Sequence, residues 1–177
     1  MNLYIEKAKM EDINELDNIQ KAAFKRLYAI YKDEKSPYLK GVDEMIKWLN
    51  LDKILYWKIY YNGHLCGGIA YYKKSEGEYY LARLYIHPQY QSKGIAKQVI
   101  LLCERKILDA KRYMLDFPID QIANRKCYES AGYIDTGMRE VINSKLTLAI
   151  YEKVVGYTNY LYAVSYTHLR AHETLAN

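Results

Sequence analysis

The chain has 177 residues, of which 50% are hydrophobic and 27% are charged, the composition of a folded globular protein rather than a disordered one. This length suits one domain with a complete core and is short for two. The formal net charge of +5 fits an anionic ligand, but the basic residues are scattered singly or in pairs, which argues against a nucleic-acid surface.

Membrane and secretory segments are not expected. No run approaches the roughly 18 consecutive apolar residues of a membrane span, and charge occurs within the first six residues. Cys66, Cys103 and Cys127 cannot all pair, and none has a Cys-x-x-Cys partner. These patterns favour a reducing, cytoplasmic location and argue against a disulfide framework or a metal site built from cysteines.

Hydrophobic periodicity predicts the elements of the first half of the chain. Apolar residues at 13, 16, 19 and 23 recur at helical spacing, whereas period-two alternation begins after Lys53. The Asn62-Gly63 pair is a strong signal for a two-residue hairpin. We expect a strand over 3–8, a helix from 10, a loop over 32–38, a helix over 43–50, and strands over 54–61 and 64–72.

The second half is predicted by the same patterns. Pro118 is expected to end a short strand, and Gly132 to end a helix in the left-handed conformation. We expect strands over 79–86, 113–116, 133–143 and 145–154, and helices over 95–110 and 120–131. Seven strands and four helices in this order predict one α/β domain over residues 1–156, with a twisted sheet that is only partly parallel.

The segment from Leu84 to Ala96 is a candidate anion site. A strand leads into a polar loop, and a long helix begins beside Gly94. The first turn of a helix presents unpaired amide N–H groups and a partial positive charge, which together bind phosphate groups. Gly94 lacks the Cβ that would keep a phosphate away from the backbone, and Lys93 adds a cation.

Two motifs resemble those of the GNAT N-acetyltransferase superfamily. Gln91-Ser92-Lys93-Gly94-Ile95-Ala96 is similar to the family's pyrophosphate-binding signature, and residues 124–133 resemble a second family motif in compressed form. The resemblance covers about residues 3–154. It implies a sheet in which strands four and five (79–86 and 113–116) splay apart and acetyl-coenzyme A binds in the gap as co-substrate.

The resemblance also implies which residues bind the coenzyme. The backbone of Leu84, Tyr85 and Ile86 would contact the pantetheine arm in the manner of an added strand. The pyrophosphate would bind the backbone amides of six loop residues: Gln91, Ser92, Lys93, Gly94, Ile95 and Ala96. Asn124 would contact the pantetheine or position the strand ends.

Tyr128 stands where many members of the family have the tyrosine that protonates the leaving thiolate. A phenol is a competent donor for this step, although the ring could instead pack beneath the sheet. The strand-four glutamate that several members use as a base is replaced by Ala82. Asp116 and Glu78 are the alternative bases, and water could also take this role.

The resemblance implies transfer of an acetyl group to a primary amine of a small molecule or peptide. Asp33, Glu34 and Tyr38 fall in a loop that borders the acceptor site in this family. The alternative is a non-catalytic acyl-coenzyme A sensor, which the missing carboxylate at Ala82 leaves open. A monomer and a homodimer are both compatible with the sequence.

The C-terminal segment resembles a translated sequencing adapter. This likeness begins at Val164, so residues 157–163 are expected to be a short natural extension and residues 164–177 a non-native tail. His168 and His172, whose spacing of four would otherwise suggest a metal site, are accordingly given no role.

Overall fold

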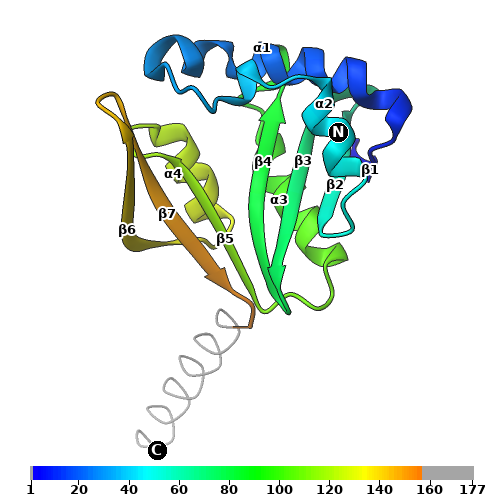
Figure 1. The fold of residues 1–177 in the computed structure, drawn as a ribbon. Helices are drawn as coiled ribbons and strands as arrows, with labels where there is room; N and C mark the ends of the chain where they lie inside the picture. The colour runs from blue at the N-terminus through cyan, green and yellow to red at the C-terminus, as the bar shows by residue number, and fades with distance from the viewer. Residues whose placement is uncertain (1, 157–177) are drawn as a thin grey trace, which may run out of the picture.

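A computed structural model of the chain describes residues 2–156, which form one sheet covered by helices on both faces (Figure 1). The described strands are β1 (Leu3–Lys7), β2 (Ile54–Tyr61), β3 (His64–Ser75), β4 (Glu78–Ile86), β5 (Arg112–Pro118), β6 (Ile134–Asn143) and β7 (Leu146–Val154). The helices are α1 (Ile13–Tyr31), α2 (Val42–Leu49), α3 (Ile95–Lys106) and α4 (Ile122–Ser130). The predicted extension 157–163 and tail 164–177 lie outside the described residues.

The sheet has the order β1-β2-β3-β4-β5-β7-β6, and β4 and β5 form its one parallel pair within residues 2–156. The predicted mixed, partly parallel α/β fold is therefore confirmed. The parallel pairing covers only three positions, from Glu78 opposite Arg112 to Tyr80 opposite Met114. Beyond them the two strands separate, as Figure 1 shows. We call the resulting gap, between residues 81–86 and 115–118, the splay.

The antiparallel half of the sheet follows from its turn residues. Asn62 and Gly63 both have positive φ, 48° and 82°, which is the requirement of the two-residue hairpin between β2 and β3. Within β3, Gly67 and Gly68 allow close approach to β4, because a Cβ on either would lie within 2.5 Å of an atom of Tyr85. Both observations place glycine where a side chain would obstruct the fold.

A β-bulge in β4 changes which side chains face which helix layer. Ala70 pairs with Arg83 and Tyr71 pairs with Leu81, so Ala82 is an extra residue in the ladder. Before the bulge, the side chain of Leu81 belongs to the core beneath α3 and α4; after it, Arg83 reaches residues of α1 and α2. The bulge therefore directs Leu81 and Arg83, which a regular strand would place on the same face, toward opposite faces of the sheet.

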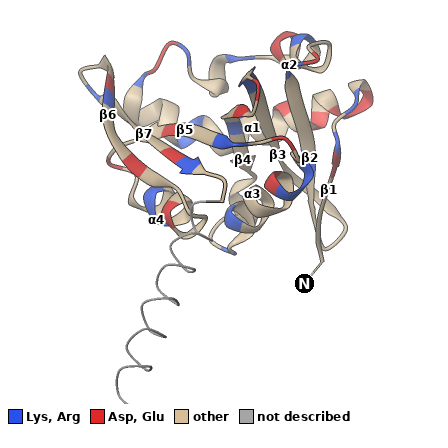
Figure 2. Ribbon diagram, turned by 90° about the horizontal axis from the view of Figure 1, so that it is seen from below, with Lys and Arg blue, Asp and Glu red and all other residues tan. Residues whose placement is uncertain are grey.

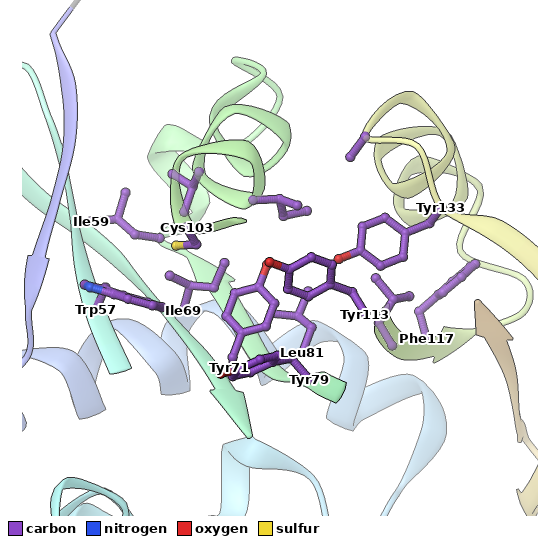
Figure 3. Packing of buried hydrophobic residues seen from close by; sticks show 14 of the residues in the cluster. Trp57, Ile59, Ile69, Tyr71, Tyr79, Leu81, Cys103, Tyr113, Phe117 and Tyr133 are labelled. Carbon is purple, nitrogen blue, oxygen red and sulfur yellow. The ribbon is translucent and has the colours of Figure 1, made fainter. Parts of the chain in front are cut away.

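Two apolar cores fill the space on either side of the sheet. The core under α1 and α2 contains Leu16 and Met45, and the core under α3 and α4 contains Val99 and Cys103. Tyrosine contributes heavily to the second of these: Tyr71, Tyr113, Tyr133 and Tyr79 are each at most 5% exposed, and Figure 3 shows the first three in a row below α3 and α4. These four tyrosines are therefore packing residues of the core.

Several predicted boundaries are wrong: α1 begins at Ile13 rather than 10, and β3 continues to Ser75 rather than 72. Helix α3 ends at Lys106 rather than 110, because Ile107 leaves helical geometry with its side chain in the core while Leu108 is 92% exposed. Strand β5 extends through Pro118, which was expected to end it at Asp116. Because the Ile119 N–H donates to Thr147 O of β7 at 2.9 Å, the Pro118 nitrogen faces the opposite edge of β5, where β4 has moved away.

Charge is interspersed along the described helices and strands rather than collected on one element (Figure 2). None of the described helices is both long and apolar enough to cross a membrane.

The close approach of β3 and β4 predicts a large effect for Gly67→Ala. The added Cβ would lie 2.2 Å from the backbone oxygen of Tyr85, so the strands must separate, and we expect a loss of about 3 kcal/mol in the free energy of unfolding. Gly41→Ser is the matched control, since no atom lies within 4 Å of its Cβ and serine suits this helix N-cap. Urea unfolding measures both; equal stability of the two variants would contradict the prediction.

Candidate active site

The loop between β4 and α3 forms a backbone cradle. Ser92 and Gly94 have positive φ, 61° and 73°, and Gly94 is the N-cap of α3. The Gln91 side chain holds the start of the loop, because its Nε2 donates to Ile86 O at 2.8 Å. The sequence therefore folds locally so that the chain turns sharply and presents its amides at the beginning of the helix.

The backbone hydrogen bonds of α3 begin with Gln98, whose N–H donates to Gly94 O at 3.4 Å. The preceding N–H groups, of residues 94 to 97, are the unpaired donors that every helix N-terminus carries. The first turn of α3 contains no acidic residue. A Cβ at Gly94 would meet only Gln98 Nε2, at 3.9 Å, so the approach to these amides is open. This geometry fits a phosphate or pyrophosphate group.

A pocket of about 530 Å³, which we call the larger pocket, runs from this cradle to the splay. Leu84, Tyr85, Ile86 and Asn124 line it, and so do all the predicted loop residues except Lys93. The structure instead brings three other basic side chains to the wall: Arg26, Lys97 and Lys126. Arg26 belongs to α1, and only the fold could reveal that it reaches this pocket.

A second pocket of about 220 Å³, the smaller pocket, lies on the α1 side of the splay. Its wall combines the end of α1 and the following loop with β4, β5 and β7. Five residues line both pockets: Phe24, Leu27, Leu84, Asn124 and Tyr128. The two pockets therefore meet in the splay, so a ligand bound in one can touch a ligand bound in the other.

Tyr128 stands at this meeting point. Its ring packs against Phe117 and Tyr133, with centroid separations of 5.2 and 6.3 Å, and this packing fixes its position on α4. Among residues 2–156 its hydroxyl has no hydrogen-bond partner. Burial raises the pKa of Tyr128 above its ordinary value, and the nearby Cys127 and Asp116 raise it further, so the phenol remains protonated. The side chain combines a packed ring with a hydroxyl available to a ligand.

Asp116 and Glu78 are placed very differently. Asp116 lines the smaller pocket and accepts a hydrogen bond from the Tyr80 hydroxyl. Burial is the main cause of the raised pKa of Asp116. The hydrogen bond from Tyr80 lowers this pKa, and the charge of Glu140 raises it. Glu78 lies at the opposite end of β4, where it accepts a hydrogen bond from Ser75 Oγ at 2.9 Å, and it lines neither pocket.

Arg83 is a wall residue that the sequence analysis assigned no role. Its Nη1 lies 2.6 Å from Glu44 Oε2 and 3.1 Å from Gln20 Oε1, and the guanidinium stacks on Trp48 with its carbon 4.4 Å from the ring centroid. These contacts hold the guanidinium against α1 and α2. No short-range sequence signal connects Arg83 with Glu44, because 39 residues separate them.

The far end of the splay is spanned by a set of contacts to Tyr31, which we call the Tyr31 clasp. The Tyr31 hydroxyl donates to Asp120 and accepts from Gln121 Nε2 at 2.7 Å, while Asn143 Nδ2 donates to Tyr31 O at 3.0 Å. These bonds join the C-terminal end of α1 to the segment before α4 and to the β6–β7 turn. The clasp therefore connects the two halves of the sheet across the smaller pocket.

Solved structures similar to this one include N-acetyltransferases. PaiA N-acetyltransferase from Thermoplasma acidophilum, in complex with coenzyme A, matches with a TM-score of 0.67 and 22% identity over 87% of this chain and 99% of that one. Spermidine N-acetyltransferase from Vibrio cholerae, in complex with CoA and spermine, matches with a TM-score of 0.70 and 16% identity over 86% of this chain and 95% of that one. The ribosomal-protein-S18-alanine N-acetyltransferase from Escherichia coli matches with a TM-score of 0.67 and 14% identity over 87% of this chain and 94% of that one. The comparison with curated proteins gave no match.

The sequence itself carries the stronger evidence of kinship. A model described as the acetyltransferase (GNAT) family matches residues 15–133, which is more than half of the chain. The matched segment runs from α1 to Tyr133 and so includes the loop cradle, the splay and Tyr128. The chain thus belongs to the acetyltransferase (GNAT) family.

Proposed function

We propose that this protein is an N-acetyltransferase that moves an acetyl group from acetyl-coenzyme A to a primary amine. The observation that carries the proposal is the meeting of two pockets at Tyr128, in the splay between β4 and β5. One pocket ends at the N-terminus of α3 and suits a diphosphate; the other is bordered by the Tyr31 clasp and suits a small acceptor.

The larger pocket would bind the coenzyme. Amides at the start of α3 would hold the pyrophosphate, with Lys97 and Lys126 nearby as counter-charges. The edge of β4 that faces the splay has no β5 partner after Tyr80, so its backbone groups can bond to the pantetheine amides as an added strand would. This arrangement would direct the thioester toward Tyr128.

The proposed reaction is direct attack of the amine on the thioester. Asp116 takes one proton from the acceptor ammonium, which frees the nitrogen lone pair to form a C–N bond with the carbonyl carbon. The C–S bond then breaks, and the thiolate receives the Tyr128 proton. The second proton of the attacking nitrogen returns to Tyr128 through solvent, so the net products are the amide, the free thiol and one proton.

A non-catalytic sensor of acyl-coenzyme A is the alternative function. It is left open by Ala82, which stands where several family members have a glutamate. The position of Asp116 weakens this argument, because a carboxylate from β5 lines the pocket that Ala82 also lines. We therefore propose catalysis rather than sensing.

A thiol-release assay with acetyl-coenzyme A and pooled primary amines tests the proposed function. We expect thiol release that depends on an amine and a matching mass increase of 42 Da, the mass of a transferred acetyl group, on the acceptor. Calorimetry with acetyl-coenzyme A is the companion measurement. Binding without release for any amine would favour the sensor, and absence of binding by a folded sample would overturn both functions.

The cradle predicts a binding defect for Gly94→Val. A β-branched residue is strained at φ 73°, and its side chain would project where the diphosphate approaches, so we expect the dissociation constant for coenzyme A to rise about tenfold or more. Gly137→Val is the matched control, since Gly137 has φ 80° but lines neither pocket. Calorimetry should show weakened binding for the first variant alone; equal weakening would indicate general strain instead.

A further inference from the structure

We infer that the acceptor is a compact apolar amine with one positive charge and no carboxylate. This inference rests on the proposed function, because it concerns the amine that would occupy the smaller pocket. It follows from three properties of that pocket: its volume, its mostly apolar lining residues and the distribution of charge around it.

The size and surface of the smaller pocket favour a small apolar body. Its volume of about 220 Å³ lies below the roughly 300–1,000 Å³ typical of sites for drug-sized ligands. Of its nineteen lining residues, fourteen are aliphatic, proline or aromatic, and they surround the space from α1, β4, β5 and β7. Transfer of an apolar group from water to such a wall is favourable by about 25 cal/mol per Å².

The charge of the pocket favours a cation. Its charged lining residues are Asp33, Asp116 and Arg83, so the formal balance is −1 before pairing is considered. Arg83 is already paired with Glu44 at 2.6 Å, and its side chain is only 9% exposed. The two aspartates have no cationic side chain within ion-pair distance among residues 2–156; Asp33 accepts the Lys35 N–H at 2.9 Å and Asp116 accepts the Tyr80 hydroxyl. The charge available to a ligand is therefore negative.

This same pairing disfavours a carboxylate on the acceptor. An amino acid would need a cation for its carboxylate, and the one cation in the described wall is neutralised by Glu44. An extended polyamine is also disfavoured, because a pocket of about 220 Å³ with mostly apolar lining residues would desolvate a second ammonium group. A monoamine with a short apolar substituent fits both constraints.

The test compares 2-phenylethylamine with phenylalanine and spermidine in the thiol-release assay. Phenylalanine shares the ring and the chain length but adds the carboxylate. We expect kcat/KM for 2-phenylethylamine to exceed that for either comparator at least tenfold. Preference for phenylalanine or spermidine would overturn the inference while leaving acetyl transfer established.

Variants of the charged residues sharpen the test. Asp33→Asn should raise KM for 2-phenylethylamine about fivefold with little change in kcat, and Glu34→Gln, an exposed neighbour that lines neither pocket, should change neither. Glu44→Gln should release the Arg83 charge and improve phenylalanine relative to 2-phenylethylamine about fivefold. No change in this ratio, in a variant that still binds acetyl-coenzyme A, would contradict the assigned role of the Arg83–Glu44 pair and overturn the inference.

Calorimetry separates failure of the inference from failure of the proposed function. In the presence of coenzyme A, 2-phenylethylamine should bind and phenylalanine should not. Amine binding without thiol release would retain the assigned ligand class and overturn catalysis. Neither binding nor release with 2-phenylethylamine would overturn the inference, whatever the other amines do.

Discussion

Tyr128→Phe is expected to lower kcat about 100-fold or more while changing the affinity for coenzyme A by less than threefold. The substitution removes only the hydroxyl, and the ring contacts with Phe117 and Tyr133 remain. Loss of a positioned general acid typically costs 10²- to 10⁴-fold in rate. Burial raises the pKa of this phenol and so keeps its proton available to the leaving thiolate. Steady-state thiol release and calorimetry measure the two effects.

Tyr133→Phe is the matched control for this experiment. It also removes one buried tyrosine hydroxyl, which donates to Glu104 Oε1 at 2.7 Å and lies away from both pockets. We expect a loss of stability of about 1 kcal/mol with nearly unchanged kcat. Equal turnover in the Tyr128 variant and the native chain would remove Tyr128 from the proposed chemistry.

Asp116→Asn is expected to lower kcat/KM about 100-fold and to abolish the acidic limb of its pH profile. In the proposed reaction only the carboxylate can accept the ammonium proton, so activity should rise as pH increases through the pKa of Asp116. Because burial raises that pKa, the limb should lie at higher pH than for an ordinary aspartate. The amide is nearly isosteric and can keep the bond to the Tyr80 hydroxyl, but it cannot accept the proton.

Glu78→Gln serves as the comparison for Asp116, since both residues were candidate bases in the sequence. Glu78 lies beside Ser75 and Arg112 at the closed end of the β4–β5 pair. We expect its variant to keep both the rate and the acidic limb. If Glu78→Gln loses the acidic limb of the pH profile, or if Asp116→Asn keeps it, the general base is a group other than Asp116.

Much of the fold could be predicted because its signals are local. The hairpin follows from Asn62-Gly63, and the start of α3 follows from Gly94 in a left-handed conformation. The predicted end of α3 was wrong because apolar residues continue to Ala110. Only tertiary packing decides that the Ile107 side chain is buried and the Leu108 side chain is exposed. Periodicity identifies a candidate helix better than it identifies where that helix stops.

The loop cradle could also be predicted, because it is one short segment whose motif resembles a known family. The acceptor wall could not, because it is assembled from residues distant in sequence. Arg83 lies in a strand whose bulge directs it toward Glu44, and Asp33 and Asp116 come from a loop and a strand 83 positions apart. Their common charge environment exists only after the sheet has formed.

The splay is supported at both ends, and this has a mechanical consequence. Three residue pairs hold β4 to β5 at one end, and the Tyr31 clasp spans the other. The width of the opening is therefore set at its two ends, by the β4–β5 pairs and by a clasp that includes Tyr31, itself a lining residue of the smaller pocket. Substitution of other lining residues would change which ligand fits, whereas substitution of Tyr31 or Asn143 would also change how far apart the two halves of the sheet are held.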